Sequence, residues 1–325
     1  MSPTLRTCVR LLGGAAILAV LVWRLGTAPF LDGIAKVDGG SLAAAAGITV
    51  LTTVGCAWRW SLVARGLGVG ISRPAAVAAY YRSLFLNTTL PGGVLGDVDR
   101  ALRHGRDAGD VVRGLRAVAW ERCAGQVVQG LLTLAVLLLL PSPVRSSMPL
   151  VTATVVVATV GVILLSRFLP HSGPSRWART LRAAGTDIRE GVLARRAWPG
   201  IVVASAVVVL GHTATFVIAA RTAGVTASTL HLLPLALLVL LAMAVPINIG
   251  GWGPREGVAA WAFGAAGLGA TQGVATAVVY GVMVFVAGLP GAVVVIVARL
   301  ARPTPHLDLA DPPRATAELE AAARG

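Results

Sequence analysis

Charged residues are scarce in this sequence, and that scarcity excludes most classes of protein. Only 13% of the 325 residues are charged and 56% are hydrophobic, with a mean hydropathy of +0.78. Soluble domains carry roughly 25% charged residues. The composition therefore predicts an all-α fold, a polytopic membrane helix bundle, and the length leaves no room for a large soluble domain beside it.

Cysteine is also rare, and motifs of known chemistry are missing from the sequence. The three cysteines are Cys8, Cys56 and Cys123, an odd number without the spacing of a metal or redox site. The sequence has no nucleophile elbow, no HExxH motif, no Walker loop and no carboxylate pair at metal-binding spacing. We therefore predict no cofactor, no metal ion, no catalytic residue and no enzymatic activity.

The net charge of +14 comes from arginines that fall in clusters between apolar segments. Such clusters mark the cytoplasmic side of membrane proteins, so the charge indicates a positive-inside topology and not nucleic-acid binding. We expect a multi-pass protein of the cell membrane, with both termini cytoplasmic and contacts to anionic lipid headgroups. Residues 1–300 would form the membrane domain, and residues 301–325 a disordered cytoplasmic tail without apolar periodicity.

Apolar runs predict about six full spans of the membrane. They cover residues 11–23, 41–62, 115–140, 149–166, 199–220 and 272–298. A short polar link is expected at residues 26–40, and an amphipathic helix on the inner leaflet at residues 171–198. Arg59 and Arg65 are interpreted as marking the cytoplasmic end of the second span. His212, inside the fifth span, is interpreted as a packing residue or a proton relay.

Two stretches rich in glycine and proline interrupt this pattern, at residues 85–100 and 245–257. Each carries charged residues, and neither can be a simple span, because proline and glycine break helices and hydrocarbon rejects unpaired charge. The arginines that follow the first stretch favour a re-entrant helical hairpin, with a short full span at residues 74–90 as the alternative. We expect two re-entrant hairpins that enter from opposite sides, as an inverted repeat requires.

Both breaks carry residues suited to binding an anion. In the second, a helix is expected to start at Pro254, with Arg255 and Glu256 at its N-terminus. The free N–H groups and the dipole of a helix N-terminus favour an anion. In the first, Asp97 is expected to cap the next helix, and Arg100 follows one turn later.

We predict that the two breaks meet in the middle of the bilayer and bind a phosphate-bearing group. Glu121 and Arg122, on the next helix, are included as partners because buried charges must be paired. The predicted site consists of Asn87, Pro91, Gly92, Gly93, Gly96, Asp97, Arg100, Glu121, Arg122, Asn248, Gly250, Gly251, Arg255 and Glu256. A purely structural role, in which these residues hold the hairpins together, is the alternative.

The two breaks resemble those of the lysylphosphatidylglycerol synthase transmembrane family, also called flippase-like. The resemblance covers residues 5–300, and Leu95 and Pro254 depart from the family's pattern. It implies an integral membrane protein associated with moving aminoacylated phospholipid between leaflets. The matching residues are Phe85-x-Asn87-x-x-Leu90-Pro91-Gly92, Gly96-Asp97-x-x-Arg100, Glu121-Arg122-x-x-Gly125, and Pro246 followed by Gly250-Gly251-x-Gly253-x-Arg255-Glu256-Gly257.

The soluble aminoacyl-transferase domain of the multidomain relatives is missing here, so the resemblance implies a stand-alone member. We expect a lipid flippase or related transporter of a phospholipid, an aminoacyl-phospholipid or a polyprenyl-phosphate carrier. The alternatives are a non-catalytic membrane partner of a lipid-modifying enzyme or glycosyltransferase, and a membrane enzyme acting on lipid phosphates. The expected partners are anionic or phosphate-bearing membrane lipids, then a lipid-modifying enzyme or a second copy of the chain as a homo-oligomer, but no nucleic acid.

Overall fold

The regular elements of the described residues are helices, which confirms the predicted all-α class. The computed structural model describes residues 3–90, 93–150, 152–154, 157, 176–244 and 252–300. A 3₁₀ turn, η1, and a π-helical turn, η2, stand among the α-helices. The elements in chain order are α1 (Pro3–Leu25), α2 (Ala28–Ala35), α3 (Gly39–Gly66), α4 (Arg73–Thr89), α5 (Leu95–Asp107), α6 (Val111–Leu139), η1 (Arg145–Ser147), α8 (Arg176–Asp187), η2 (Ile188–Val192), α9 (Trp198–Thr222), α10 (Thr229–Ala242), α11 (Pro254–Ala265), α12 (Ala270–Ala287) and α13 (Pro290–Leu300).

Four helices of the described residues are long and apolar enough to cross a membrane. They are α3, α6, α9 and the run Ala270–Leu300, which α12 and α13 form together. A fifth unit arises if the paired helices Ala15–Leu25 and Ala28–Ala35, which bend by 96°, count as one span. The four helices correspond to four of the six predicted spans, and the bent pair overlaps the predicted span at residues 11–23 and the predicted link at residues 26–40. The remaining one, residues 149–166, lies mostly outside the described residues.

The polar link predicted at residues 26–40 contains a helix, α2, that the sequence pattern does not indicate. Gly33 of this helix is buried against α12, where a Cβ atom would come 3.0 Å from the carbonyl oxygen of Ala275. Asp38 then caps α3 by accepting from the backbone N–H of Ser41 at 2.9 Å, a bond that lowers the pKa of its carboxyl. The link is therefore a packed element and not an open loop.

Two pairs of short helices form hairpins, α4 with α5 and α10 with α11. The four helices have 17, 13, 14 and 12 residues. At about 1.5 Å per residue, none reaches the roughly 30 Å of a hydrocarbon core. The helical hairpins that the glycine- and proline-rich breaks predict are thus confirmed, and their insertion into a bilayer from opposite sides stays a prediction.

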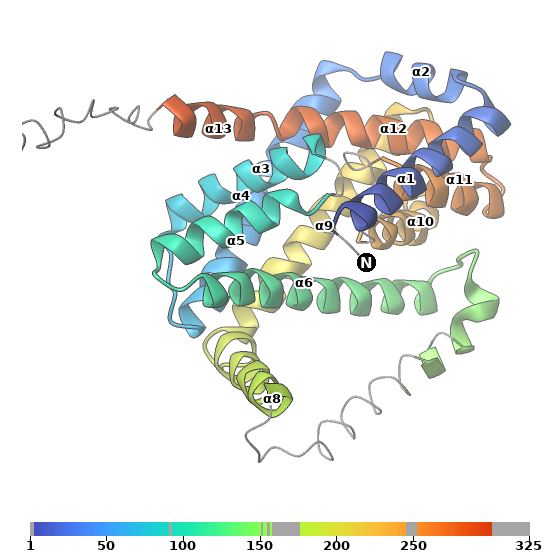
Figure 1. Ribbon diagram of the computed structural model, residues 1–325. Helices are drawn as coiled ribbons and strands as arrows, with labels where there is room; N and C mark the ends of the chain where they lie inside the picture. Colours follow the sequence, from blue (N-terminus) through green and yellow to red (C-terminus); the bar gives the residue numbers. More distant parts are fainter. Residues whose placement is uncertain are drawn as a thin grey trace, which may run out of the picture.

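The two hairpins lie toward opposite ends of α6 (Figure 1). The first half of α6 contacts α5, and a Cβ atom on Gly114 would come 2.6 Å from the Cα of Gly105. Leu132 and Val136, in the second half of α6, pack against the apolar core that α9, α10, α11 and α12 share. An inverted repeat requires such an opposed placement.

Each hairpin has its own apolar core, and α9 contributes to both. Trp60 and Tyr80 belong to the core beside α4, together with Ile201 of α9. Phe216 of α9 and Phe263 of α11 belong to the other core, with ring centres 6.3 Å apart in an edge-on arrangement. The helix α9 therefore connects the two halves of the bundle.

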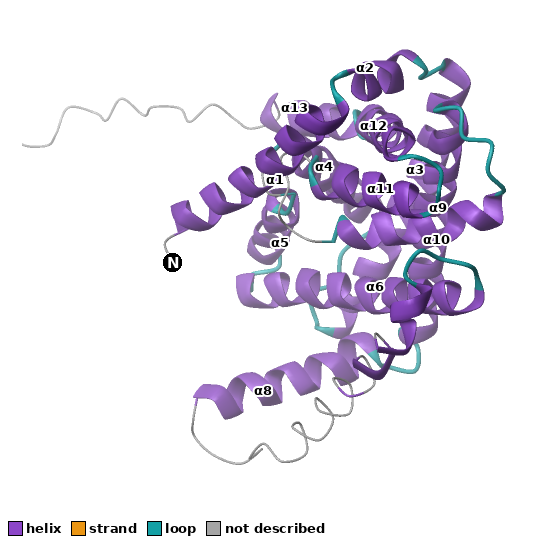
Figure 2. Cartoon of the chain, turned by 90° about the vertical axis from the view of Figure 1, so that its right-hand side faces the viewer, coloured by secondary structure: helices purple, strands orange, loops and turns teal. Residues whose placement is uncertain are grey.

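The amphipathic segment predicted at residues 171–198 is helical over its described part, α8 and η2. Figure 2 shows α8 at the edge of the bundle. Asp187 attaches it to α6, because its carboxylate accepts from Arg116 Nε at 2.5 Å and from Trp120 Nε1 at 2.9 Å. The helical structure ends at Val192, short of the predicted end.

Candidate functional site

Glu121 of α6 is the centre of a first charged cluster. Its side chain is fully buried, and both of its oxygens accept hydrogen bonds from arginines of other helices. Arg59 of α3 donates its Nε and Nη2 to Oε1 at 2.8 and 2.5 Å, and Arg100 of α5 donates its Nη2 to Oε2 at 3.1 Å. Because a buried carboxylate requires a matching charge, Glu121 joins three helices.

Asp97 of α5 is the second acid of this cluster. Its Oδ1 accepts from Ser83 Oγ at 3.0 Å, from Arg100 Nη2 at 3.1 Å and from Arg122 Nη2 at 2.7 Å. Its Oδ2 accepts from Asn87 Nδ2 at 3.2 Å. Arg100 is therefore shared between the two acids, and the charged residues of α4, α5 and α6 form one network.

The turn between α4 and α5 depends on Asn87 and Gly96. The side-chain oxygen of Asn87 accepts from the backbone N–H of Gly96 at 2.8 Å. A Cβ atom on Gly96 would collide with the carbonyl oxygen of Ser83, so only glycine lets α5 begin this close to α4. The predicted capping role of Asp97 is wrong, because Val94 is the N-cap residue and Asp97 accepts from side chains instead.

Arg100 packs against two aromatic rings. Its guanidinium carbon is 4.5 Å from the centre of the Trp60 ring and 4.0 Å from that of Tyr80. Its Nε and Nη1 atoms are buried and have no hydrogen-bond partner among the described residues. The faces of the two rings attract the guanidinium cation, and this attraction offsets part of the energetic cost of leaving Nε and Nη1 without hydrogen bonds. Because it packs against both rings, whose centres are 6.2 Å apart, Arg100 has a fixed orientation.

The first cluster contains more positive than negative charge. Three guanidiniums, of Arg59, Arg100 and Arg122, face the carboxylates of Asp97 and Glu121, which leaves a formal excess of one positive charge. Arg122 is the accessible member, because 42% of its side chain is exposed against 5% for Arg59 and 1% for Arg100. An anion that reached Arg122 would balance the cluster.

A second cluster lies at the start of α11. Pro254 opens this helix as predicted, and Arg255 and Glu256 follow in its first turn, both buried. Glu256 accepts from the backbone N–H of Gly253 and from Arg255 Nε, each at 2.7 Å. The carboxylate of Glu256 thus occupies the helix N-terminus at which an anion is predicted, and it also neutralises Arg255.

A glycine on a neighbouring helix seats the guanidinium in each cluster. A Cβ atom on Gly125 of α6 would come 2.6 Å from Nη1 of Arg59. A Cβ atom on Gly281 of α12 would come 2.8 Å from Cζ of Arg255. Both arginines therefore lie flat against a helix at a position where no side chain projects.

Helix α9 contacts the first cluster directly and reaches the second through Tyr280 of α12. Ser205 accepts from Arg59 Nη1 at 3.1 Å, and further along the same helix His212 Nδ1 lies 3.2 Å from the hydroxyl of Tyr280. The Tyr280 ring is in turn 5.8 Å from the guanidinium of Arg255. Among the described residues no ion pair joins the two clusters directly. The described residues therefore form two charged clusters. The meeting of the two breaks stays a prediction, because residues 91–92 and 245–251 lie outside the described residues.

Most of the predicted site residues fall into these clusters. Gly93 lies in the turn after α4 with a φ of 62°, a conformation that favours glycine. The first cluster contains Asn87, Gly96, Asp97, Arg100, Glu121 and Arg122, and the second contains Arg255 and Glu256. Pro91, Gly92, Asn248, Gly250 and Gly251 lie outside the described residues.

Arg59 is the main site residue that the sequence pattern leaves out of the predicted site. The pattern puts it at the cytoplasmic end of a span, but it is buried and paired with Glu121. One feature of the sequence could have indicated this pairing. Arg59 lies inside an apolar run, between Trp58 and Trp60, where a charged side chain needs a partner. The sequence does not indicate that Trp60 and Tyr80 contact Arg100 in the first cluster, because aromatic side chains are common in apolar helices.

Gly125→Ala is expected to destabilise the protein by about 1–3 kcal/mol, the usual cost of overpacking a filled site. The added methyl group would push the Arg59 guanidinium away from Glu121. Thermal unfolding in detergent, followed by circular dichroism, measures the effect. Gly130→Ala, further along α6, is the control, because a Cβ atom there meets nothing within 4 Å. Equal melting temperatures for the two variants would contradict this seating of Arg59.

The fold and the two clusters define a polytopic helical membrane protein with buried charged groups in paired hairpins. The chain belongs to the lysylphosphatidylglycerol synthase TM region family, whose model matches residues 8–291. This range contains both hairpins and both clusters, so the resemblance indicated by the two breaks is confirmed. Comparisons with curated proteins and with solved structures give no match. Family membership makes this a membrane protein of lipid metabolism or transport.

Proposed function

We propose that this protein moves a phosphate-bearing lipid between the two leaflets of the cell membrane. The observation that carries the proposal is the excess positive charge of the first cluster, with Arg122 as its accessible arginine. Burying an arginine without a full complement of acids is costly, and a visiting anion removes that cost. The family supports lipid as the class of molecule that supplies the anion.

The substrate class follows from the chemistry of the guanidinium group. Its planar N–H donors match the oxygens of a phosphate and can form two parallel hydrogen bonds with it. Phospholipids, aminoacyl-phospholipids and polyprenyl phosphates share this group. Arg122 would make the first contact, and Arg100, packed against Trp60 and Tyr80, would present a fixed positive charge nearby.

Transport between leaflets requires that the charged path be reachable from both sides in turn. The hairpins lie toward opposite ends of α6, and α9 connects the clusters through Ser205 and His212. Inverted hairpins in transporters shift against a scaffold around a central site. The pair of Arg255 and Glu256 would open in one of these states and expose a second phosphate-binding arginine, the role that the sequence pattern predicts for Arg255.

The two charged clusters suit the binding and movement of a lipid phosphate, and we assign no catalytic step to them. The arginine-rich segments between spans favour cytoplasmic positions for both termini. This orientation places Arg65 of α3 and the helix α8 on the inner side. Labelling of single introduced cysteines in sealed vesicles would test that orientation.

Reconstitution into liposomes tests the proposed transport. The purified protein is expected to speed the movement of phosphatidylglycerol carrying a fluorescent acyl chain several-fold over protein-free liposomes, measured by dithionite quenching of the outer leaflet. A glycosyl diacylglycerol with the same label is the control, because it lacks the phosphate that an arginine recognises. Equal rates with and without protein would refute transport, and equal acceleration of both lipids would refute phosphate recognition.

A further inference from the structure

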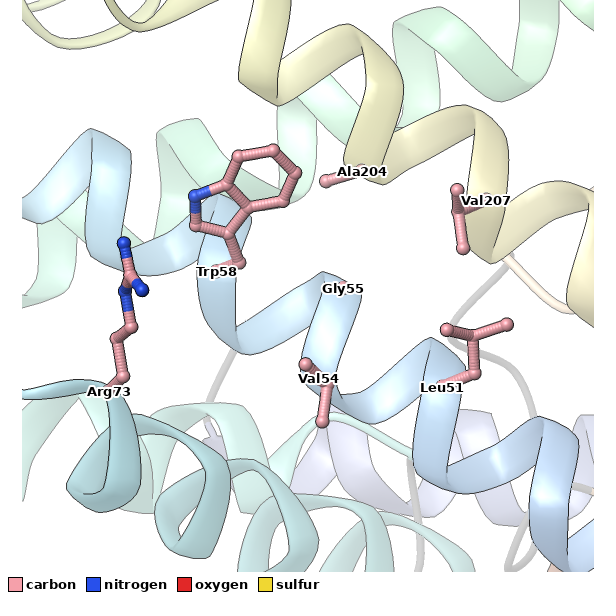
Figure 3. Close-up of a pocket in the computed structure, with 7 residues that line it drawn as sticks. All are labelled: Leu51, Val54, Gly55, Trp58, Arg73, Ala204 and Val207. Carbon is pink, nitrogen blue, oxygen red and sulfur yellow. The ribbon is translucent and has the colours of Figure 1, made fainter.

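A groove of about 420 Å³ lies on the seam between α3 and α9, and no residue of either charged cluster lines it. Leu51, Val54 and Trp58 of α3 form one wall, and Ala204 and Val207 of α9 form the other. Figure 3 shows Arg73 at one end of the groove, with Leu51 and Val207 at the other. The volume lies within the range of roughly 300–1,000 Å³ found for ligand pockets.

Small residues create the groove. Gly55 lies at its floor, and a Cβ atom there would come 3.3 Å from Cγ2 of Val208 and 3.6 Å from the carbonyl oxygen of Ala204. The two helices therefore touch at Gly55, while the larger side chains of Leu51 and Val54 stand on one side of the hollow. Leu51 and Val54 are 56% and 45% exposed on a helix long and apolar enough to cross the membrane, so this face meets acyl chains.

Arg73 makes the groove chemically asymmetric. It is the first residue of α4, it is exposed, and no hydrogen bond or ion pair links it to another described residue. Trp58 lies near it in the groove wall (Figure 3). Tryptophan and arginine together are typical of the membrane interface, where the headgroups begin. The groove thus runs from an apolar end to a single cation at headgroup level.

We infer that this groove binds one acyl chain of an anionic phospholipid, whose phosphate pairs with Arg73. Charge complementarity selects the ligand, since the apolar walls accept a hydrocarbon chain and the guanidinium, which has no partner among the described residues, attracts an anion at its end. The predicted orientation puts Arg73 on the cytoplasmic side, where the leaflet carries the anionic lipids. The lining contains no residue of either cluster, and lipid binding here does not require that the protein transports lipid.

Lipid retention measured by native mass spectrometry tests the inference. The full-length protein would be taken from nanodiscs with equal amounts of phosphatidylglycerol and phosphatidylcholine and stripped progressively with detergent. The wild type is expected to keep one phosphatidylglycerol after its other lipids are lost. Val54→Trp, which fills the groove, should lose it. Val203→Trp, at a position of α9 that is 54% exposed and outside the groove, should keep it.

A second pair of variants tests the headgroup contact. Arg73→Gln should erase the preference for phosphatidylglycerol over phosphatidylcholine, whereas Arg106→Gln, which removes an exposed arginine at the end of α5, should not. Equal retention of the two lipids by the wild type would reduce the groove to ordinary lipid-facing surface. A dimer that Val54→Trp dissociates would show instead that the groove is an interface between copies. Either outcome would overturn the inference.

Discussion

Glu121→Gln is expected to destabilise the protein by about 3–5 kcal/mol, the cost of removing one partner from a buried ion pair. The amide has nearly the shape of the carboxylate, so packing is kept and only charge is lost. Arg59 and Arg100, with 5% and 1% of their side chains exposed, would then remain buried without the acid that joins them. We expect little monodisperse protein on size exclusion and a melting temperature far below that of the wild type.

Asp110→Asn is the matched control for this loss of a carboxylate. Asp110 pairs with Arg113 at the start of α6, but the two side chains are 39% and 55% exposed, and such pairs contribute at most about 1 kcal/mol. Asparagine also caps a helix about as well as aspartate, so the hydrogen bond to the Arg113 backbone can survive. If both variants melted at the same temperature, Glu121 could not be the group that holds the first cluster together.

The elements that the sequence predicts are those that depend on local composition. The apolar runs predict α3, α6 and α9, because a span requires about 20 apolar residues in a row. Proline and glycine predict the two hairpins, and the position of Pro254 predicts the start of α11 with Arg255 and Glu256 in its first turn. In each case the deciding physical factor lies within a few residues of the feature.

The elements that the sequence misses depend on distant residues. Arg59 has its acid 62 positions away on α6, so the positive-inside rule alone places it at the membrane edge. Asp97 stands where a helix cap is reasonable, but Ser83, Asn87 and Arg122 satisfy it from other helices. Long-range pairing overrides the local preference at both positions.

The two halves of the chain use the same arrangement. In each, a buried arginine pairs with a buried glutamate and lies over a glycine of a neighbouring helix, Arg59 over Gly125 and Arg255 over Gly281. Sequence alone shows these glycines only as flexible or small residues, because the arginine that needs the space comes from another helix. The repetition agrees with an inverted repeat, in which both halves bury charge by the same means.

Arg122→Gln is expected to abolish most lipid transport while leaving the fold intact. The change removes the excess positive charge, so Arg59 and Arg100 would face Asp97 and Glu121 in equal numbers. Asp97 would keep its bonds to Ser83, Asn87 and Arg100. A hydrogen bond to a charged group contributes roughly 1.5–3 kcal/mol, so the rate of phosphatidylglycerol movement should fall about tenfold to a hundredfold.

The melting temperature separates this role from a structural one. If Arg122 serves only to neutralise Asp97, Arg122→Gln should destabilise the protein in proportion to any loss of transport. If it receives the lipid phosphate, the variant should melt near the wild-type temperature and still fail to move lipid. Arg122→Lys keeps the charge but loses the planar pair of donors, and it should show an intermediate rate. Wild-type transport by Arg122→Gln would remove Arg122 from the lipid path, because the positive charge that distinguishes the first cluster would then have no part in binding.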